Sequence, residues 1–162
     1  QLRELLVSFR LGLSADLATL MEDAAREYGT RGGLEVALAV ELGPCQLSPN
    51  QEVHVLQIVR EALSNMVRHA SARHAWVALR GGADGEVLLE VRDDGCGIGA
   101  PPADARNHHG LAIMRERARS MGGEIDIGPA LPSGTRVCVR FRSANASMAA
   151  MAQGDAKKET ET

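Results

Sequence analysis

The sequence predicts an α/β domain. Segments in which apolar residues recur at helical spacing alternate with short segments of strand character, and their boundaries fall at Gly, Pro and Ser clusters. The chain has 162 residues, of which 44% are hydrophobic and 24% are charged, a composition typical of one globular domain. Helices and strands that alternate along one domain-sized chain favour the α/β class.

Residues 1–28 carry Leu, Phe and Met at spacings of three and four, which predicts helix. Gly12 is a plausible break, with Ser14 as the cap of a second helix. The chain starts as if within a helix and without an initiator Met, so we expect it to be a piece of a longer protein. The imperfect alternation in residues 34–40 then predicts a strand.

The next helix has the clearest start signal in the chain. Ser48 is predicted to cap it, Pro49 occupies the first helical position, and Gln51 completes a capping box. Apolar residues at helical spacing continue to about residue 69. The remaining expected elements are strands at 74–80 and 86–92, a polar Gly- and Pro-containing loop at 94–109, a helix at 111–121, and a hairpin of strands at 124–127 and 135–141.

Composition excludes several classes of function. The net charge of −3 gives no basic field for nucleic acid, and aromatic residues, at 2%, are too few for base stacking. No apolar run approaches the roughly 20 residues that a membrane span needs. The cysteines, Cys45, Cys96 and Cys138, are far apart in the sequence and form neither a zinc pattern nor a disulfide framework.

One helix carries a polar pair beside its apolar arc. Glu61 and Asn65 lie four residues apart, so they stack on one face, and His69 follows one turn later at the apolar border. A carboxylate and an amide oxygen one turn apart suit Mg²⁺ or its water. Taken alone, the pair is equally compatible with an ordinary solvated helix face, and His69 with a border histidine.

Two glycine elements follow. Asp93 ends a strand and precedes Gly95 and Gly97, where backbone can approach a ligand and a carboxylate can accept from an amino group such as that of adenine. A simple Asp-Gly turn is the alternative. Gly110 is predicted to open the helix at 111–121, whose N-terminus suits phosphate. Adjacent His108 and His109 lack a third ligand nearby, so a metal site there is rejected.

Motifs from four places in the chain, taken in order, resemble the histidine-kinase ATPase family. The first three resemble its N box, G1 box and G2 box, and the last matches a late Gly-Thr pair. They are Glu61-Ala62-Leu63-Ser64-Asn65 with Arg68-His69, Asp93-Asp94-Gly95-Cys96-Gly97, His109-Gly110-Leu111, and Gly134-Thr135. Each motif is weak alone, but their order and spacing within residues 34–142 are specific.

The resemblance implies a Bergerat fold, an α/β two-layer sandwich in which helices cover one face of a mixed sheet. It implies ATP and Mg²⁺ as ligands. By the same resemblance, Asn65 binds Mg²⁺, Glu61 assists at the metal and in phosphoryl transfer as a polar or general-base residue, and Asp93 holds the adenine amino group. The other residues implied to contact ATP are Arg68, His69, Gly95, Gly97, Ile98, His109, Gly110, Leu111 and Thr135.

Three further segments carry a closer resemblance: Gln1-Leu2-Arg3-Glu4-Leu5-Leu6 with Phe9-Arg10, Leu56-Gln57-Ile58-Val59-Arg60-Glu61-Ala62-Leu63-Ser64-Asn65, and Asp94-Gly95-Cys96-Gly97. By these segments the sequence is similar, within that family, to the nitrate/nitrite sensor kinases. This implies a protein-histidine kinase that transfers the γ-phosphoryl group of ATP to a His on a dimerisation domain, with a NarL-type response regulator as partner, at the cytoplasmic side of a bacterial inner membrane. Residues 1–29 would be the end of the dimerisation helix and a linker or leading helix, 30–142 the catalytic domain, and 143–162 a disordered tail. No contact with nucleic acid or directly with the membrane is expected.

Two departures from the family pattern accompany the resemblance. Asp94 stands where the family usually has Asn, which adds a negative charge near the nucleotide. Two interpretations are open: the charge weakens nucleotide binding, or it is solvated and neutral in effect. No His lies in a phosphoacceptor box, so the chain is expected to bind ATP without phosphorylating itself in the family manner. The alternatives are an anti-sigma-factor-type serine kinase with the same ATP fold and a nucleotide-binding module that has lost its chemistry.

Overall fold

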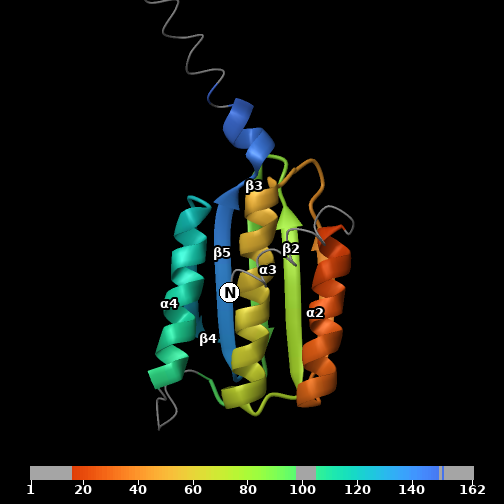
Figure 1. The fold of residues 1–162 in the computed structure, drawn as a ribbon, viewed down its shortest axis with the longest axis vertical. Coiled ribbons are helices and arrows are strands. Elements are labelled where there is room, and N and C mark those ends of the chain that lie inside the picture. The colour runs from red at the N-terminus through yellow and green to blue at the C-terminus, as the bar shows by residue number, and fades with distance from the viewer. Residues whose placement is uncertain (1–15, 98–104, 150, 152–162) are drawn as a thin grey trace, which may run out of the picture.

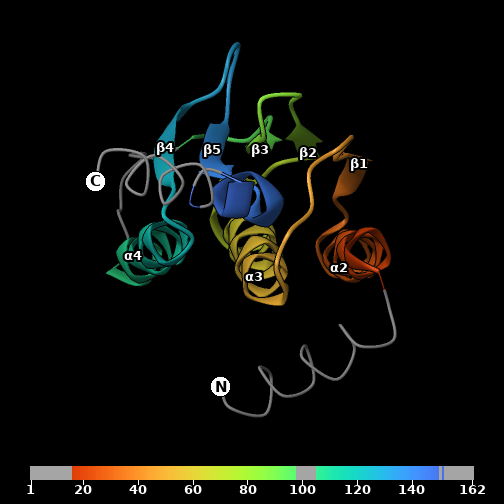
Figure 2. The ribbon, with the colours of Figure 1, turned by 90° about the horizontal axis from the view of Figure 1, so that it is seen from above.

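Helices cover one face of a five-stranded sheet, as Figures 1 and 2 show from two directions. The computed structural model describes residues 16–97, 105–149 and 151. The three helices on the covered face are α2 (Leu17–Gly32), α3 (Pro49–Asn65) and α4 (Ala105–Ser120). No helix in the described part of the chain is both long and apolar enough to cross a lipid bilayer. The predicted two-layer α/β class is confirmed.

The sheet is mixed, with the strand order β1-β2-β3-β5-β4. β1 pairs with β2 in parallel, and every other neighbouring pair is antiparallel. The antiparallel pairing of β3 with β5 brings the end of β3 and the start of β5 to the same edge. The strands are β1 (Glu35–Glu41), β2 (His74–Gly81), β3 (Glu86–Asp93), β4 (Glu124–Pro129) and β5 (Thr135–Arg142).

The core lies between the sheet and the helices. Alternate residues of β3 and β5 are buried because successive side chains of a strand point to opposite faces of the sheet. From β3 these are Val87, Leu89 and Val91, and from β5 they include Val139 and Phe141. The apolar face of α3 packs against these strand residues, and its members Val55, Ile58 and Leu63 are fully buried.

The predicted capping box at the start of α3 is confirmed. The Ser48 hydroxyl accepts a hydrogen bond from the Gln51 backbone N–H at 3.1 Å, and the Gln51 side chain accepts from the Ser48 N–H at 3.0 Å. The cap predicted for the preceding helix is wrong. Asp16 caps α2, accepting from the Ala18 N–H at 2.9 Å, whereas Ser14 lies outside the described residues.

The predicted boundary between residues 29 and 30 does not divide the structure. α2 buries Leu17, Met21 and Ala24 in the same core as α3 and the sheet. It ends at Gly33, whose positive φ of 61° suits a left-handed C-cap, and β1 follows at once. α2 is therefore part of the same folded unit as α3 and the sheet.

The prediction that the chain is disordered from residue 143 is wrong for its first part. Residues 144–149 form a helix above the sheet, drawn in blue in Figure 1. Two hydrogen bonds of the Asn145 side chain join this helix to the loop before α3. The Asn145 side chain accepts one from the Gln46 N–H at 3.1 Å and donates one to the Pro44 carbonyl at 3.0 Å. Composition suggested disorder because short Ala- and Ser-rich segments carry no periodic apolar stripe.

We expect Asn145→Ala to lower the free energy of unfolding by about 1–2 kcal/mol, because two hydrogen bonds between distant segments are lost. Met148→Ala is the matched control on the same helix, since Met148 is 71% exposed and should shift stability by less than about 0.5 kcal/mol. Urea unfolding of both variants measures the difference. Equal stability of N145A and the unsubstituted chain would show that this helix is not anchored as described.

Candidate functional site

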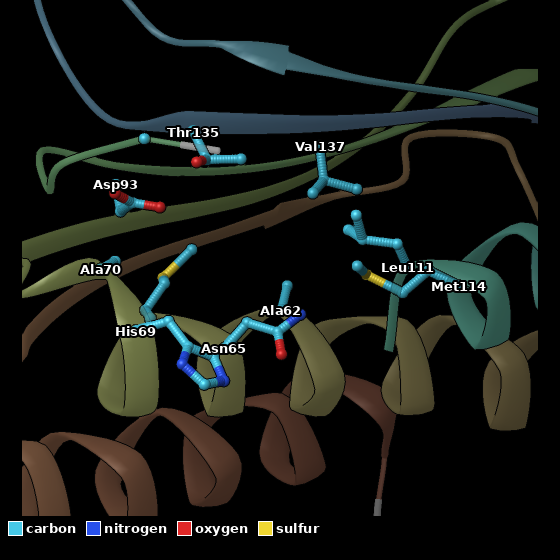
Figure 3. A pocket seen from close by; sticks show the side chains of 11 residues that line it. Ala62, Asn65, His69, Ala70, Asp93, Leu111, Met114, Thr135 and Val137 are labelled. Atoms are coloured by element: carbon cyan, nitrogen blue, oxygen red, sulfur yellow. The ribbon is translucent and has the colours of Figure 1, made fainter. Parts of the chain in front are cut away.

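A pocket lies between the sheet, α3 and α4, at the edge where β3 ends and β5 begins (Figure 3). It brings together side chains from all four motifs singled out in the sequence. From the predicted set it contains Asn65, His69, Asp93, Gly97, Leu111 and Thr135. The fold therefore unites residues that are up to 70 positions apart in the sequence.

Asp93 is the charged side chain most deeply set in this pocket. It is 2% exposed and occupies the last position of β3. Its carboxylate accepts a hydrogen bond from the Gly95 N–H at 2.8 Å. Burial raises the pKa of Asp93, while the backbone N–H groups of Gly95 and Thr135 act in the opposite direction. A buried acceptor of this kind suits a ligand that brings its own N–H donors.

Glycines allow the backbone to close around Asp93. Gly97 and Gly134 have φ values of 83° and 97°, a region that favours glycine. A Cβ on Gly134 would collide with the Asp93 carbonyl and lie 2.8 Å from its carboxylate. Gly95 packs against Ala70, whose Cβ would be 2.8 Å from a Cβ added there. Gly95, Gly97 and Gly134 thus form a close-packed backbone cradle around Asp93.

The N-box residues come from the end of α3 and a π-helical turn, η1 (Met66–Ala70). The sequence predicts continuous helix to residue 69 and gives no sign of this change. π-Helical turns are rare and occur frequently at functional sites. Asn65 and His69 line the pocket opposite Asp93 and Thr135, as Figure 3 shows. Arg68 is exposed and is not part of the lining.

Glu61 and Gly110 meet where α3 and α4 pack together. A Cβ on Gly110 would collide with the Glu61 carboxylate and lie 3.3 Å from the Asn65 side-chain amide. The prediction that Gly110 opens a helix is wrong, because α4 begins at Ala105. Gly110 is an interior residue of α4 that permits close packing, and His109 beside it is exposed. The glycine was interpreted as a boundary because it is a poor helix former.

Asp94 follows Asp93 in the chain but does not line the pocket. Its carboxylate accepts hydrogen bonds from the N–H groups of Arg73 at 2.9 Å and His74 at 3.0 Å. It also lies 2.7 Å from the His74 Nδ1 atom. These contacts, chiefly those with His74, lower the pKa of Asp94 to about 2. Its negative charge is therefore held at the start of β2.

Sequence reasoning missed the apolar part of the lining. Ala62, Met66, Ala70, Met114 and Val137 contact the same space. Their spacing on the helices is that of ordinary core residues, so no signal in the sequence separates them from the core. Ile98, predicted to contact the ligand, lies outside the described residues.

The residues present fit a magnesium ion that is held mainly by a nucleotide. Within the described ranges no cluster of three or more His, Cys, Asp or Glu side chains is suited to hold a metal. Asn65 and Glu61 supply oxygen donors one turn apart on α3. Mg²⁺ typically takes one or two protein oxygens, with substrate phosphates and water completing its shell.

Comparison with known proteins agrees with this geometry. Residues 50–145 match the family described as histidine kinase-, DNA gyrase B- and HSP90-like ATPase. The nitrate/nitrite sensor protein NarX of Escherichia coli (strain K12) is 40% identical over 144 residues, which are 87% of this chain and 23% of NarX. The nitrate/nitrite sensor protein NarQ of the same strain is 39% identical over 145 residues, which are 89% of this chain and 25% of NarQ.

The chain thus spans about a quarter of the length of these relatives. Among solved structures, full-length ShkA in complex with AMPPNP aligns with a TM-score of 0.62 and 26% identity, covering 80% of this chain and 31% of ShkA. The match to the family covers more than half of the chain and contains all four motifs. The chain therefore belongs to the histidine kinase-, DNA gyrase B- and HSP90-like ATPase family.

Proposed function

We propose that this chain binds ATP with Mg²⁺ and serves as the catalytic ATP-binding domain of a sensor histidine kinase in nitrate/nitrite signalling. The observation that carries the proposal is the pocket itself, in which Asn65, Asp93 and Thr135 face one another across a family-matched fold. The identity to NarX and NarQ favours the nitrate/nitrite sensors. It does not favour an anti-sigma-factor-type serine kinase.

Adenine recognition is assigned to Asp93 and its glycine cradle. An adenine amino group is a donor, and the buried Asp93 carboxylate is an acceptor with one oxygen already used by Gly95. The apolar walls formed by Met66, Leu111 and Val137 suit a flat ring. The Thr135 hydroxyl group provides a further polar contact on the adenine side of the pocket.

Phosphate binding and metal binding are assigned to the opposite end of the same pocket. Asn65 would hold the Mg²⁺ ion, with Glu61 one turn earlier beside it. A bound Mg²⁺ ion would neutralise part of the phosphate charge. Phosphoryl transfer depends on such charge neutralisation and on positioning more than on covalent chemistry by the protein. His69 lines the pocket and Arg68 is exposed beside it, and both are proposed to lie near the phosphates.

The remaining steps belong to the longer protein that the relatives represent. We propose that the γ-phosphoryl group passes to a His on a dimerisation domain, with Glu61 as the polar or general-base residue. A NarL-type response regulator would then receive it, at the cytoplasmic side of a bacterial inner membrane. These assignments rest on the identity to NarX and NarQ over nearly nine-tenths of this chain.

Asn65→Asp tests the proposed metal site. We expect this substitution to weaken binding of ATP in the presence of Mg²⁺ by about tenfold or more, because a ligand oxygen is altered and a negative charge is added beside the phosphates. Calorimetric titration with Mg²⁺ and again with a chelator measures the effect. For the unsubstituted chain, the chelator should weaken binding strongly.

Asn50→Asp is the matched control for Asn65→Asp. It makes the same amide-to-acid change on the same helix, at an exposed position near its N-terminus. We expect its affinity for ATP to remain that of the unsubstituted chain. Unchanged ATP affinity in N65D would contradict the assignment of Asn65, whereas an equal loss in N50D would attribute the effect to charge alone.

A further inference from the structure

We propose that Asp94 is a positioning residue for nucleotide recognition. Its side chain binds the start of β2, and this contact fixes the turn after β3 and therefore the position of the Asp93 carboxylate. The inference rests on the proposed function, since it concerns how the same pocket recognises ATP.

The Asp94 side chain joins two segments that are 20 residues apart. Its Oδ1 atom accepts from the backbone N–H groups of Arg73 and His74, at 2.9 and 3.0 Å. Its Oδ2 atom lies 2.7 Å from the His74 Nδ1 atom. The Asp94 N–H also donates to the His74 carbonyl at 3.3 Å. Four contacts therefore hold Asp94 against His74, the first residue of β2, and Arg73, which precedes that strand.

Asp94 also joins the turn to the loop between β4 and β5. The Ser133 hydroxyl donates to the Asp94 carbonyl at 3.1 Å. Gly134, the next residue of that loop, packs directly against Asp93, and Thr135 follows in the pocket. Both sides of the Asp93 cradle are thus tied to the backbone of Asp94.

The neighbourhood of His74 strengthens this hold. The Glu35 carboxylate of β1 lies 3.4 Å from the His74 Nε2 atom, on the other side of the ring from Asp94. The Trp76 ring stacks on His74 with centroids 6.1 Å apart. The His74 imidazole therefore contacts two carboxylates and one aromatic ring, and these contacts restrict the orientation of the ring that Asp94 binds.

Position 94 requires a side-chain oxygen that accepts hydrogen bonds from the N–H groups of Arg73 and His74, and it does not require a negative charge. An Asn side chain also has an oxygen that accepts from the two backbone N–H groups, and its amide donates to a neutral imidazole nitrogen. Ala offers neither contact. We therefore expect ATP binding to change little when Asn replaces Asp94 and to weaken when Ala replaces it.

The test compares two ligands that differ only at the group that Asp93 is proposed to bind. One ligand is ATP, and the other is purine riboside triphosphate, which lacks the 6-amino group. Calorimetric titration with Mg²⁺ is carried out on the unsubstituted chain, D94A, D94N and E90A. Glu90→Ala is the matched control. It removes a carboxylate of β3, the strand that ends just before Asp94, together with its ion pair to Arg136, and Glu90 does not line the pocket.

We expect D94A to bind ATP about tenfold more weakly while its affinity for the analogue changes less than about twofold, because the defect acts through Asp93. D94N and E90A should bind both ligands within about twofold of the unsubstituted chain. ATP affinity in D94A equal to that of the unsubstituted chain would overturn the inference. An equal loss for ATP and the analogue would also overturn it, since that indicates general damage to the pocket.

The outcomes separate this inference from the proposed function. Failure of the unsubstituted chain to bind ATP, or to prefer ATP over the analogue, contradicts the proposed function. Normal binding by the unsubstituted chain together with normal binding by D94A contradicts the role of Asp94 alone. If D94A does not fold, His74→Ala replaces it. H74A removes the contact at Nδ1 and leaves the three hydrogen bonds of Asp94 with the backbone of residues 73 and 74. It should weaken ATP binding by about threefold, and unchanged ATP binding by H74A would then overturn the inference.

Discussion

Asp93→Asn is expected to weaken ATP binding by about a hundredfold or more while the domain stays folded. The carboxylate is buried and accepts from Gly95, so its remaining acceptor capacity faces the pocket. An amide in its place presents a donor to the adenine amino group, which leaves two donors facing each other in a buried site. Calorimetric titration with ATP and Mg²⁺ measures the loss.

Stability should respond to Asp93→Asn in the opposite sense to binding. Burial raises the pKa of Asp93, so ionisation of this carboxyl is less favourable in the folded than in the unfolded chain. The contribution of Asp93 to stability is fully present below its ordinary pKa and is lost as pH rises through the raised value. The amide is neutral at every pH, as the protonated carboxyl is. The melting temperature of D93N should therefore be at or above that of the unsubstituted chain at neutral pH, and the difference should shrink on acidification.

Asp126→Asn is the matched control for Asp93→Asn. It makes the same change on β4, where Asp126 is exposed and takes no part in the pocket lining. Its ATP affinity should stay unchanged. Strong ATP binding by D93N would contradict the role assigned to Asp93. A large drop in the melting temperature of D93N at neutral pH would show that the carboxylate is required for folding instead.

Gly134→Ala is expected to cost about 3 kcal/mol of stability or more, which corresponds to roughly 10 °C in melting temperature. Gly134 has a φ of 97°, and an added Cβ would collide with the Asp93 carbonyl. The neighbour is backbone, so a side-chain rotation does not relieve the collision. The same displacement moves Asp93, and ATP binding should fall together with stability.

Gly128→Ala provides the comparison for Gly134→Ala. Gly128 lies in β4, and no atom comes within 4 Å of a Cβ added there. Its backbone is outside the positive-φ region. The expected change in stability is within about 1 kcal/mol. Thermal unfolding of the two variants decides the matter, and equal melting temperatures would refute the close packing described for Gly134 against Asp93.

Local sequence signals were sufficient for most of the architecture. The Ser48-Pro49 start of α3 and the strands around the Gly81–Gly85 turn depend on nearest neighbours and on period alone. The family resemblance, not periodicity, supplied the mixed sheet and the pocket, because strand order is a property of distant segments. Asp93 and Thr135 meet only because β3 pairs with β5.

The remaining features depend on tertiary contacts that leave no local trace. The start of α4 was missed because Gly110 weakens the helix signal, whereas in the fold it permits contact with Glu61. The contacts of Asp94 could not be predicted because its partners, Arg73 and His74, are 20 or more residues away in the sequence. The helix at 144–149 is held by Asn145 contacts rather than by an apolar stripe.

The central claim is that the pocket around Asp93 and Asn65 recognises ATP together with Mg²⁺. Calorimetric titration of the unsubstituted chain with ATP, and separately with GTP, in the presence and absence of Mg²⁺ tests it most directly. The account predicts binding of ATP that Mg²⁺ strengthens, with GTP at least about tenfold weaker because its 6-oxo group is an acceptor facing a carboxylate. Equal binding of ATP and GTP, or no binding of either, would contradict it.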